Sequence, residues 1–218
     1  MNKEWSELNK TMQAQIKKKD TYKMGIDTLF SLRNQLMQTL VSFKEELCRE
    51  DFNAIPFINA DGYHSKTIAY SIWHIFRIED IVAHTVITED EQVFFTGNYQ
   101  VRINSPIITT GNELVKQQIA DFSKQLNLEE LYSYIFEVRE STEKILERFS
   151  YDELKWKIPD ERKGYLKSLN VVNCDEKAIW LIDYWCSKDI RGLIQMPFSR
   201  HWIMHTEACL RIKNKMHS

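Results

Sequence analysis

The longest periodic segment of the chain, residues 21–47, has the spacing of an amphipathic helix. Apolar residues recur there every three or four positions, with Arg33 as the single charged interruption: Ile26, Leu29, Leu36, Leu40, Phe43 and Leu47. Each residue of an α-helix turns by about 100°, so this spacing places them on one face. A long helix with one apolar face is typical of a helical bundle, where neighbouring helices cover that face.

Similar spacing predicts further helices along the chain. They are expected at residues 68–82, at 128–149 after the capping residue Asn127, at 173–185, and from Pro197 or Ser199 to about Lys213. Only six glycines and four prolines interrupt the 218 residues, which favours long helices over tight hairpins. The sequence therefore predicts an all-α fold, a four-helix bundle, with long and mostly irregular crossover loops at residues 88–110 and 155–173.

A shorter amphipathic segment precedes these helices. Trp5, Leu8, Met12 and Ile16 lie three or four positions apart, and a basic run at 17–19 follows them. We therefore expect residues 1–20 to form an N-terminal helical extension and residues 21–218 to form the bundle domain.

The composition argues against several classes of partner. The 29 basic and 31 acidic residues give a formal net charge of −2, which provides no electrostatic basis for wrapping nucleic acid or binding an anionic membrane. The first residues do not resemble a signal peptide, and no uncharged run approaches the length of a membrane span. Four scattered cysteines without a C-x-x-C pair are expected to be reduced thiols. We expect a cytoplasmic protein that binds neither nucleic acid nor membrane.

The strongest functional signal is a set of three histidines. His201 and His205 are four residues apart, so on a helix they lie about 40° apart around the axis and ~6 Å apart along it. Alone, such a pair fits two surface or core histidines as well as a metal site. His74 lies on or beside the apolar stripe of another predicted helix, where a buried imidazole needs a polar partner. Three histidines from two helices meet that need by binding one divalent metal ion.

Other titratable residues fit this site less well. His84 lies ten residues after His74, about 80° round and ~15 Å along a continuous helix, too far to share the ion. Glu207 lies about 160° from His205 and is expected on the opposite face of its helix. Cys209 continues the histidine stripe, and a buried structural thiol is favoured over a fourth ligand.

Three neutral nitrogen ligands leave one or more coordination positions for water or a substrate, as in catalytic zinc sites. The donor set suits Zn or Ni, and also Fe, Co or Mn. A ferritin-like di-iron bundle would need Glu-x-x-His on its helices, but Ser71, Phe198 and Trp202 stand three residues before the three histidines. The sequence therefore favours a single metal ion with open positions.

Two further residues lie close to His74 on its helix. Arg77 could meet an anionic group of a substrate, and Tyr70 could donate a hydrogen bond to it. We consider both as substrate-orienting residues. For Arg77, an ion pair with Asp80 or with a carboxylate of a neighbouring helix is the alternative interpretation.

Residues 71–80 and 199–207 resemble the metal-site helices of the DinB-like superfamily of bacterial proteins. The family motif is one histidine in the second helix and an HxxxH pair in the last, which matches His74, His201 and His205. The similarity runs from about Thr21 to Lys213. It implies a four-helix bundle that binds Ni, Zn or a similar ion and often forms a homodimer. Members with assigned activities include thiol-dependent transferases and an isomerase, so the resemblance implies a low-molecular-weight thiol as a substrate.

These observations leave three functional hypotheses. In the first, the metal activates a low-molecular-weight thiol for transfer to an electrophilic small molecule, and the protein is an S-transferase. In the second, the ion only stabilises the bundle, with no chemistry. In the third, the protein is a stress-response interaction module that uses its N-terminal helix as a partner surface.

Overall fold

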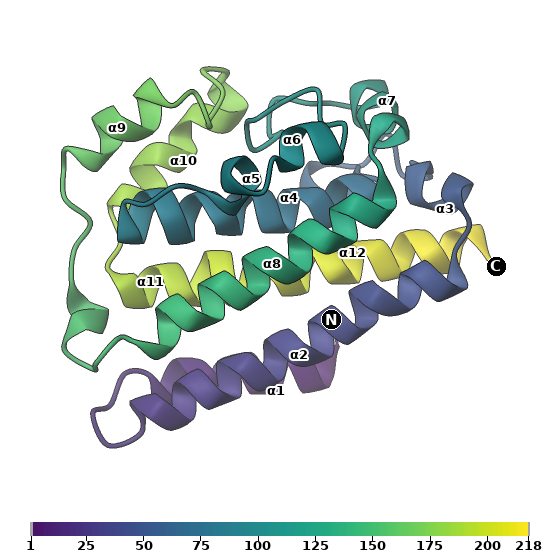
Figure 1. The fold of residues 1–218 in the computed structure, drawn as a ribbon. Helices are drawn as coiled ribbons and strands as arrows, with labels where there is room; N and C mark the ends of the chain where they lie inside the picture. Colours follow the sequence, from purple (N-terminus) through teal and green to yellow (C-terminus); the bar gives the residue numbers. More distant parts are fainter. Residues whose placement is uncertain (1, 218) are drawn as a thin grey trace.

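The computed structural model describes residues 2–217, and every regular element among them is a helix. Four long helices lie alongside one another (Figure 1): α2 (Tyr22–Glu46), α4 (Ile68–Asp80), α8 (Leu128–Glu147) and α12 (His201–Met216). Both α2 and α4 contact α8 and α12. The all-α prediction is confirmed. No helix among the described residues has both the length and the apolar character needed to span a bilayer.

The N-terminal helix α1 (Lys3–Gln15) packs along α2 at the lower edge of Figure 1. Its apolar face buries Trp5 and Met12, and Ile16 follows as a fully buried residue. The two helices approach closely near Gly25, where a Cβ atom would lie 2.5 Å from Ile16 Cγ2. The predicted helix is confirmed, and it shares the core with α2; the division of the chain at residue 20 stays a prediction.

Side-chain caps set where the central helices begin. The Asn127 side chain accepts hydrogen bonds from the backbone N–H groups of Glu129 and Glu130, as its position before an acidic first turn predicts. The Thr67 hydroxyl accepts from the backbone N–H of Tyr70 and so caps α4, the helix that carries His74. These caps satisfy backbone donors that have no partner within the helix.

The two predicted crossover loops contain more helix than expected. After α4, the chain continues as the π-helical segment η2 (Ile81–Thr88) and then forms α5 (Val93–Thr96) and α6 (Tyr99–Arg102). The second crossover includes the 3-10 turn η3 (Glu153–Lys155) and the helix α9 (Arg162–Ser168). Tertiary contacts hold these short helices: the Asp80 carboxylate accepts the backbone N–H groups that open α5, and buried Arg162 donates to the Thr85 carbonyl. Such contacts leave no periodic pattern in the sequence.

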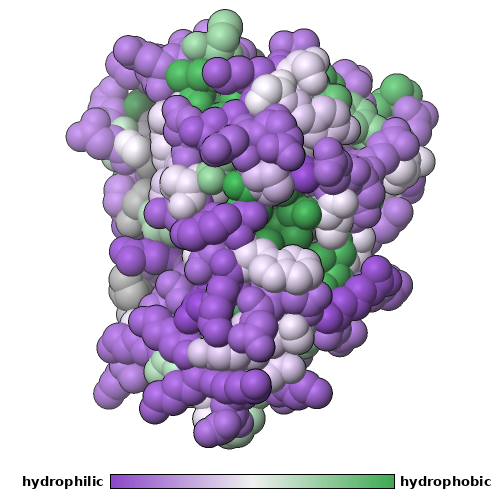
Figure 2. All heavy atoms as spheres, turned by 90° about the vertical axis from the view of Figure 1, so that its left-hand side faces the viewer, coloured by the Kyte–Doolittle hydropathy of each residue, from purple (hydrophilic) through white to green (hydrophobic). Residues whose placement is uncertain are grey.

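The remaining short elements connect the long helices. They are α3 (Arg49–Asn53), η1 (Gly62–His64), α7 (Gln117–Gln125), α10 (Glu176–Cys186), α11 (Ile190–Gln195) and the π-helical segment η4 (Met196–Arg200), which leads directly into α12. The last helical run therefore begins at Met196, next to the predicted Pro197. Figure 2 looks at the left-hand end of Figure 1, where hydrophilic side chains cover most of the surface and hydrophobic atoms show between them near the centre.

Two apolar clusters of the core meet along α4. Its apolar residues up to Phe76 pack in a cluster with Trp202, whereas Ile78 and the apolar residues of η2 pack in a second cluster with Trp185. His74 lies close to this junction on a helix whose residues are all buried. His74 therefore lies between two apolar parts of the core.

Candidate metal centre

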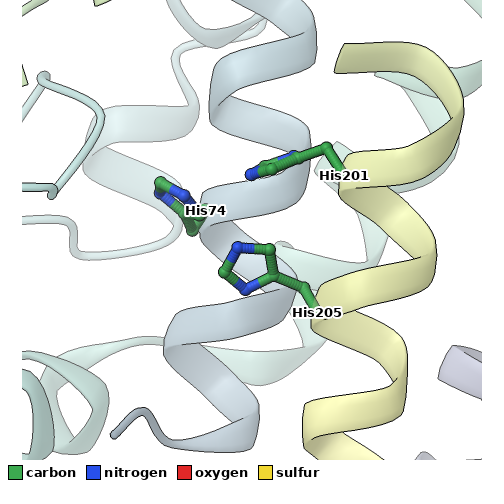
Figure 3. Close-up of side chains that lie close together, drawn as sticks. All are labelled: His74, His201 and His205. Atoms are coloured by element: carbon green, nitrogen blue, oxygen red, sulfur yellow. The ribbon is translucent and has the colours of Figure 1, made fainter. Parts of the chain in front are cut away.

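His74 on α4 faces His201 and His205 on α12, and the three rings point toward one another (Figure 3). One ring nitrogen from each lies within 4.8 Å of the others, close enough for one ion to be shared. The ring centroids are 5.0 Å apart for His74 and His201, 4.9 Å for His74 and His205, and 4.6 Å for His201 and His205. Within residues 2–217 this is the one cluster of three such donors. The predicted meeting of these histidines is confirmed.

A backbone carbonyl fixes the tautomer of His74. Its Nδ1 lies 2.6 Å from the Thr110 carbonyl oxygen. A carbonyl can only accept, so Nδ1 carries the proton and donates, and Nε2 keeps its lone pair for a metal. Histidine ligands are commonly oriented by such a second hydrogen bond.

All three imidazoles are neutral at physiological pH. Burial lowers the pKa of His74 well below its usual value, and the neighbouring His201 lowers it further. Burial lowers the pKa of His201 to about 4, and burial with the adjacent histidines lowers the pKa of His205 well below the usual range. A neutral imidazole has the free lone pair that a metal needs. The Nδ1 atom of His201 is buried without a hydrogen-bond partner, which a metal or a bound molecule would supply.

One face of α4 holds the loop that orients His74. Three side chains on this face donate to three carbonyls of the loop: Tyr70 Oη to Gly111 at 2.9 Å, His74 Nδ1 to Thr110 at 2.6 Å, and Arg77 Nε to Ile108 at 3.0 Å. The donors are four and three residues apart, so they lie on one face of the helix and bind three nearly consecutive carbonyls. We call residues 108–111 the carbonyl loop. Its attachment to α4 fixes the position of the Thr110 oxygen.

The structure gives Arg77 and Tyr70 contacts with the protein itself. Arg77 is fully buried, donates two hydrogen bonds to Ile108 O, and lies 3.6 Å from Asp80 Oδ2, as the alternative interpretation predicted. The Tyr70 hydroxyl donates to Gly111 O, and its ring lines the cavity beside His74. Contact of either residue with a substrate stays a prediction.

We expect the Gly111→Ala variant to lose stability and metal affinity together. Gly111 has φ +75°, and a Cβ there would lie 2.8 Å from Trp73 Cζ3 and 3.0 Å from Tyr70 Cε2. The left-handed backbone and the crowded position should together lower the free energy of unfolding by about 2–3 kcal/mol. Displacement of the adjacent Thr110 carbonyl should weaken metal binding roughly 10-fold, as loss of outer-shell partners does. Urea unfolding of the chelated protein and metal titration measure the two effects.

Gly164→Ala is the matched control. Gly164 is an exposed residue of α9 with no atom within 4 Å of a built Cβ. Alanine in a helix should leave stability unchanged or raise it by up to ~1 kcal/mol. Equal stability of the Gly111→Ala variant and the native chain would show that the carbonyl loop does not need its observed conformation.

The other titratable residues lie outside the histidine cluster, as predicted. His84 hydrogen-bonds Asp90 at 2.6 Å and Ser141 at 3.0 Å. Cys209 is fully buried, and burial raises the pKa of its thiol to about 12, which keeps it protonated. The structural-thiol interpretation of Cys209 fits this environment.

The histidine cluster borders two cavities. A larger cavity of about 590 Å³ is lined by His74 and His205 together with Lys66, Lys116 and Lys177. A smaller cavity of about 310 Å³ is lined by all three histidines and by mainly apolar side chains. Ligand sites of enzymes have volumes in this range. A molecule in either cavity would lie beside at least two of the three histidines.

Sequence reasoning missed three features of this site. The Thr110 carbonyl belongs to the backbone, so no pattern of residue types indicates that it binds His74. Asn112 lines both cavities with a buried side-chain oxygen that has no hydrogen-bond partner. Burial lowers the pKa of Lys66 to about 8, and its ammonium lies 4.9 Å from the Tyr70 ring centroid. The residues 108–116 have no helical periodicity, so their proximity to His74 follows only from the folded structure.

Comparison with family models gave no match for this chain, and comparison with curated proteins gave none either. The resemblance to the DinB-like superfamily therefore rests on the histidine motif and stays a prediction. The residues themselves suit a divalent cation, because the cluster offers three neutral nitrogen donors and one of them is oriented by a carbonyl.

Proposed function

We propose that the chain is a DinB-like four-helix bundle that binds one divalent ion and transfers a low-molecular-weight thiol to an electrophile. His74, His201 and His205 are the ligands, and the ion is Zn or Ni, with Fe, Co and Mn as further candidates. The observation that carries the proposal is the convergence of three neutral, buried histidines beside two cavities. Three protein ligands leave a position open to a substrate, whereas closed four-ligand sites are structural.

The residues around the site have separate roles in this reaction. A bound divalent cation would supply positive charge that stabilises a thiolate relative to its thiol. The histidines would hold that charge in place, and the Thr110 carbonyl would keep His74 oriented. Lys66 would attract an anionic group of the thiol from the wall of the larger cavity.

The transfer step is a nucleophilic substitution. The thiol proton passes to solvent water, and the sulfur electron pair forms a bond to an electrophilic carbon. The leaving group, such as chloride, departs with the electron pair of its own bond. The products are a thioether, a chloride ion and a hydrated proton, so no oxidant or reductant is required.

A purely stabilising role of the ion is the second proposal. His74 belongs to α4 and the other two histidines to α12, so a shared ion would join two long helices. Metal binding would then contribute folding free energy without chemistry. The homodimer that the family resemblance implies belongs to both proposals.

We expect the metal-loaded protein to accelerate thiol conjugation about 10-fold relative to the chelated protein at pH 7. A free thiol with a pKa of about 8.5 is only a few per cent ionised at that pH, and full ionisation is partly offset by the lower nucleophilicity of a stabilised thiolate. The assay follows chloride release from 1-chloro-2,4-dinitrobenzene with bacillithiol, mycothiol, glutathione or cysteine.

His205→Ala should reduce this rate to that of the chelated protein, and His84→Ala should retain it. Equal rates for loaded protein, chelated protein and buffer with all four thiols would refute the transfer reaction. The stabilising role would then account for the histidine cluster.

A further inference from the structure

The smaller cavity beside the histidines has an apolar wall without any Lys, Arg, Asp or Glu among its lining residues. Its apolar side chains come from α4, α10, η4 and α12, and they include Ile78, Trp180, Trp185, Met196, Pro197 and Met204. A wall of this composition favours an uncharged hydrophobic molecule, because a charged one would lose its hydration without an ionic partner.

Trp180 gives this cavity an aromatic face. Its side chain is 50% exposed, whereas Trp73, Trp185 and Trp202 are buried in the core. The indole N–H donates to the Lys177 carbonyl at 2.9 Å, so the hydrogen-bonding capacity of this tryptophan is already used. The ring therefore offers the cavity an apolar aromatic surface held in a fixed orientation. The flexible thioethers Met196 and Met204 can adapt to different shapes of occupant.

The larger cavity has the opposite chemistry. Its lining includes three lysines against one carboxylate, Asp61. His74, His205 and Asn112 line both cavities, so the two cavities adjoin at these residues. The partnerless side-chain oxygen of Asn112 lies at this junction and can accept a hydrogen bond from a bound molecule.

We propose that the apolar cavity binds an uncharged aromatic or alkyl electrophile, which meets an anionic thiol held by the lysines of the larger cavity. The identification of the occupant as an electrophile rests on the proposed transfer reaction. The binding of an uncharged hydrophobic molecule in this cavity does not depend on that reaction. The cavity of about 310 Å³ fits a small aromatic molecule. The lysines line only the larger cavity, and Trp180, Met196 and Met204 line only the smaller one, so each substrate has a cavity of matching chemistry beside the histidines.

Binding of N-phenyl-1-naphthylamine tests this proposal directly. The molecule is neutral and aromatic, and its fluorescence rises in apolar surroundings. We expect saturable binding of one molecule per chain in the full-length protein, both metal-loaded and chelated. Trp180→Ala should weaken binding about 5- to 10-fold through loss of an aromatic contact. Met204→Lys should weaken it at least 10-fold, because it places a charge in the apolar wall.

Trp156→Ala and Lys177→Ala are the matched controls. Trp156 is 57% exposed and lines neither cavity, and Lys177 lies on α10 like Trp180 but lines the larger cavity. Both variants should bind the naphthylamine as the native chain does, with circular dichroism confirming the fold of all four. Absence of saturable binding, or equal losses for Trp156→Ala and Trp180→Ala, would overturn the proposal. Failure of thiol transfer with intact naphthylamine binding would refute the reaction but not the hydrophobic site.

Discussion

Replacing His74 and His201 together by alanine is expected to reduce bound metal from one ion per chain to less than a tenth of an ion. The change leaves only one of the three nitrogens that converge within 4.8 Å. Loss of a single outer-shell partner typically weakens metal binding ~10–100-fold, so removal of two ligands should exceed 100-fold. Elemental analysis by mass spectrometry after gel filtration in metal-free buffer measures the stoichiometry.

His84→Ala is the control for this double variant. His84 is a buried histidine that follows α4 in η2, but its ring nitrogens bind Asp90 and Ser141. Metal content per folded chain should therefore remain at one ion. Full occupancy in the His74→Ala/His201→Ala variant would exclude the histidine cluster as the metal site, and loss of metal in folded His84→Ala would contradict the geometry of α4 and η2.

Metal binding should also stabilise the native chain. A ligand that binds only the folded state raises the free energy of unfolding by ~4 kcal/mol at a thousand times its dissociation constant. The double variant should show the same unfolding curve with and without added metal. This readout does not depend on any enzymatic activity.

Helical periodicity was sufficient to predict which histidines meet. The rotation per residue of an α-helix was enough to predict that His201 and His205 lie side by side. The position of His74 on an apolar stripe was enough to predict that it faces them. The same rotation placed His84 away from the cluster, although the chain changes to a π-helix at Ile81. The cap at Asn127 could be predicted because a capping side chain binds backbone groups only two or three residues away.

Features that depend on distant contacts could not be predicted in this way. The Thr110 carbonyl reaches His74 only because Tyr70 and Arg77 hold the carbonyl loop against α4. The sequence predicts a loop where helix α9 forms. This seven-residue helix is stabilised partly by a hydrogen bond from Arg162 to a carbonyl 77 residues away, which no local pattern indicates. The two cavities and Asn112 between them likewise arise from segments that are far apart in sequence.

A buried ion pair joins α2 to α4, the helix that carries His74. Arg33 on α2 makes two hydrogen bonds to Glu79 on α4, at 2.7 and 2.9 Å, and both side chains are fully buried. Glu79 also accepts from Trp202 Nε1 at 2.7 Å, and Arg33 donates to Phe198 O at 3.2 Å. Trp202 directly follows His201, and Phe198 lies three residues before it. The pair therefore connects α2, α4 and α12 close to the histidine cluster.

The negative charge of Glu79 stabilises the buried positive charge of Arg33. Burial opposes the charged guanidinium of Arg33, but the carboxylates of Glu79 and Glu143 outweigh this effect and raise its pKa above the usual value. Arg33 also lies 4.3 Å from the centroid of the Trp202 ring. If the Glu79 charge is removed, only Glu143 remains to neutralise a fully buried cation. A buried charge without its partner is strongly destabilising.

Glu79→Gln should therefore lower the free energy of unfolding by about 3–5 kcal/mol in the chelated protein, as removal of one partner of a buried pair does. The glutamine oxygen can still accept from Trp202, so the loss reports mainly on the charge. Adding Arg33→Met removes the unpaired cation, and the double variant should be more stable than Glu79→Gln alone, because residues of one network are not additive. The exposed pair Lys144 and Glu140 is the control, where Lys144→Met should cost no more than ~0.5 kcal/mol. Urea unfolding measures all four chains, and a Glu79→Gln variant as stable as Lys144→Met would show that the buried pair does not hold these helices together.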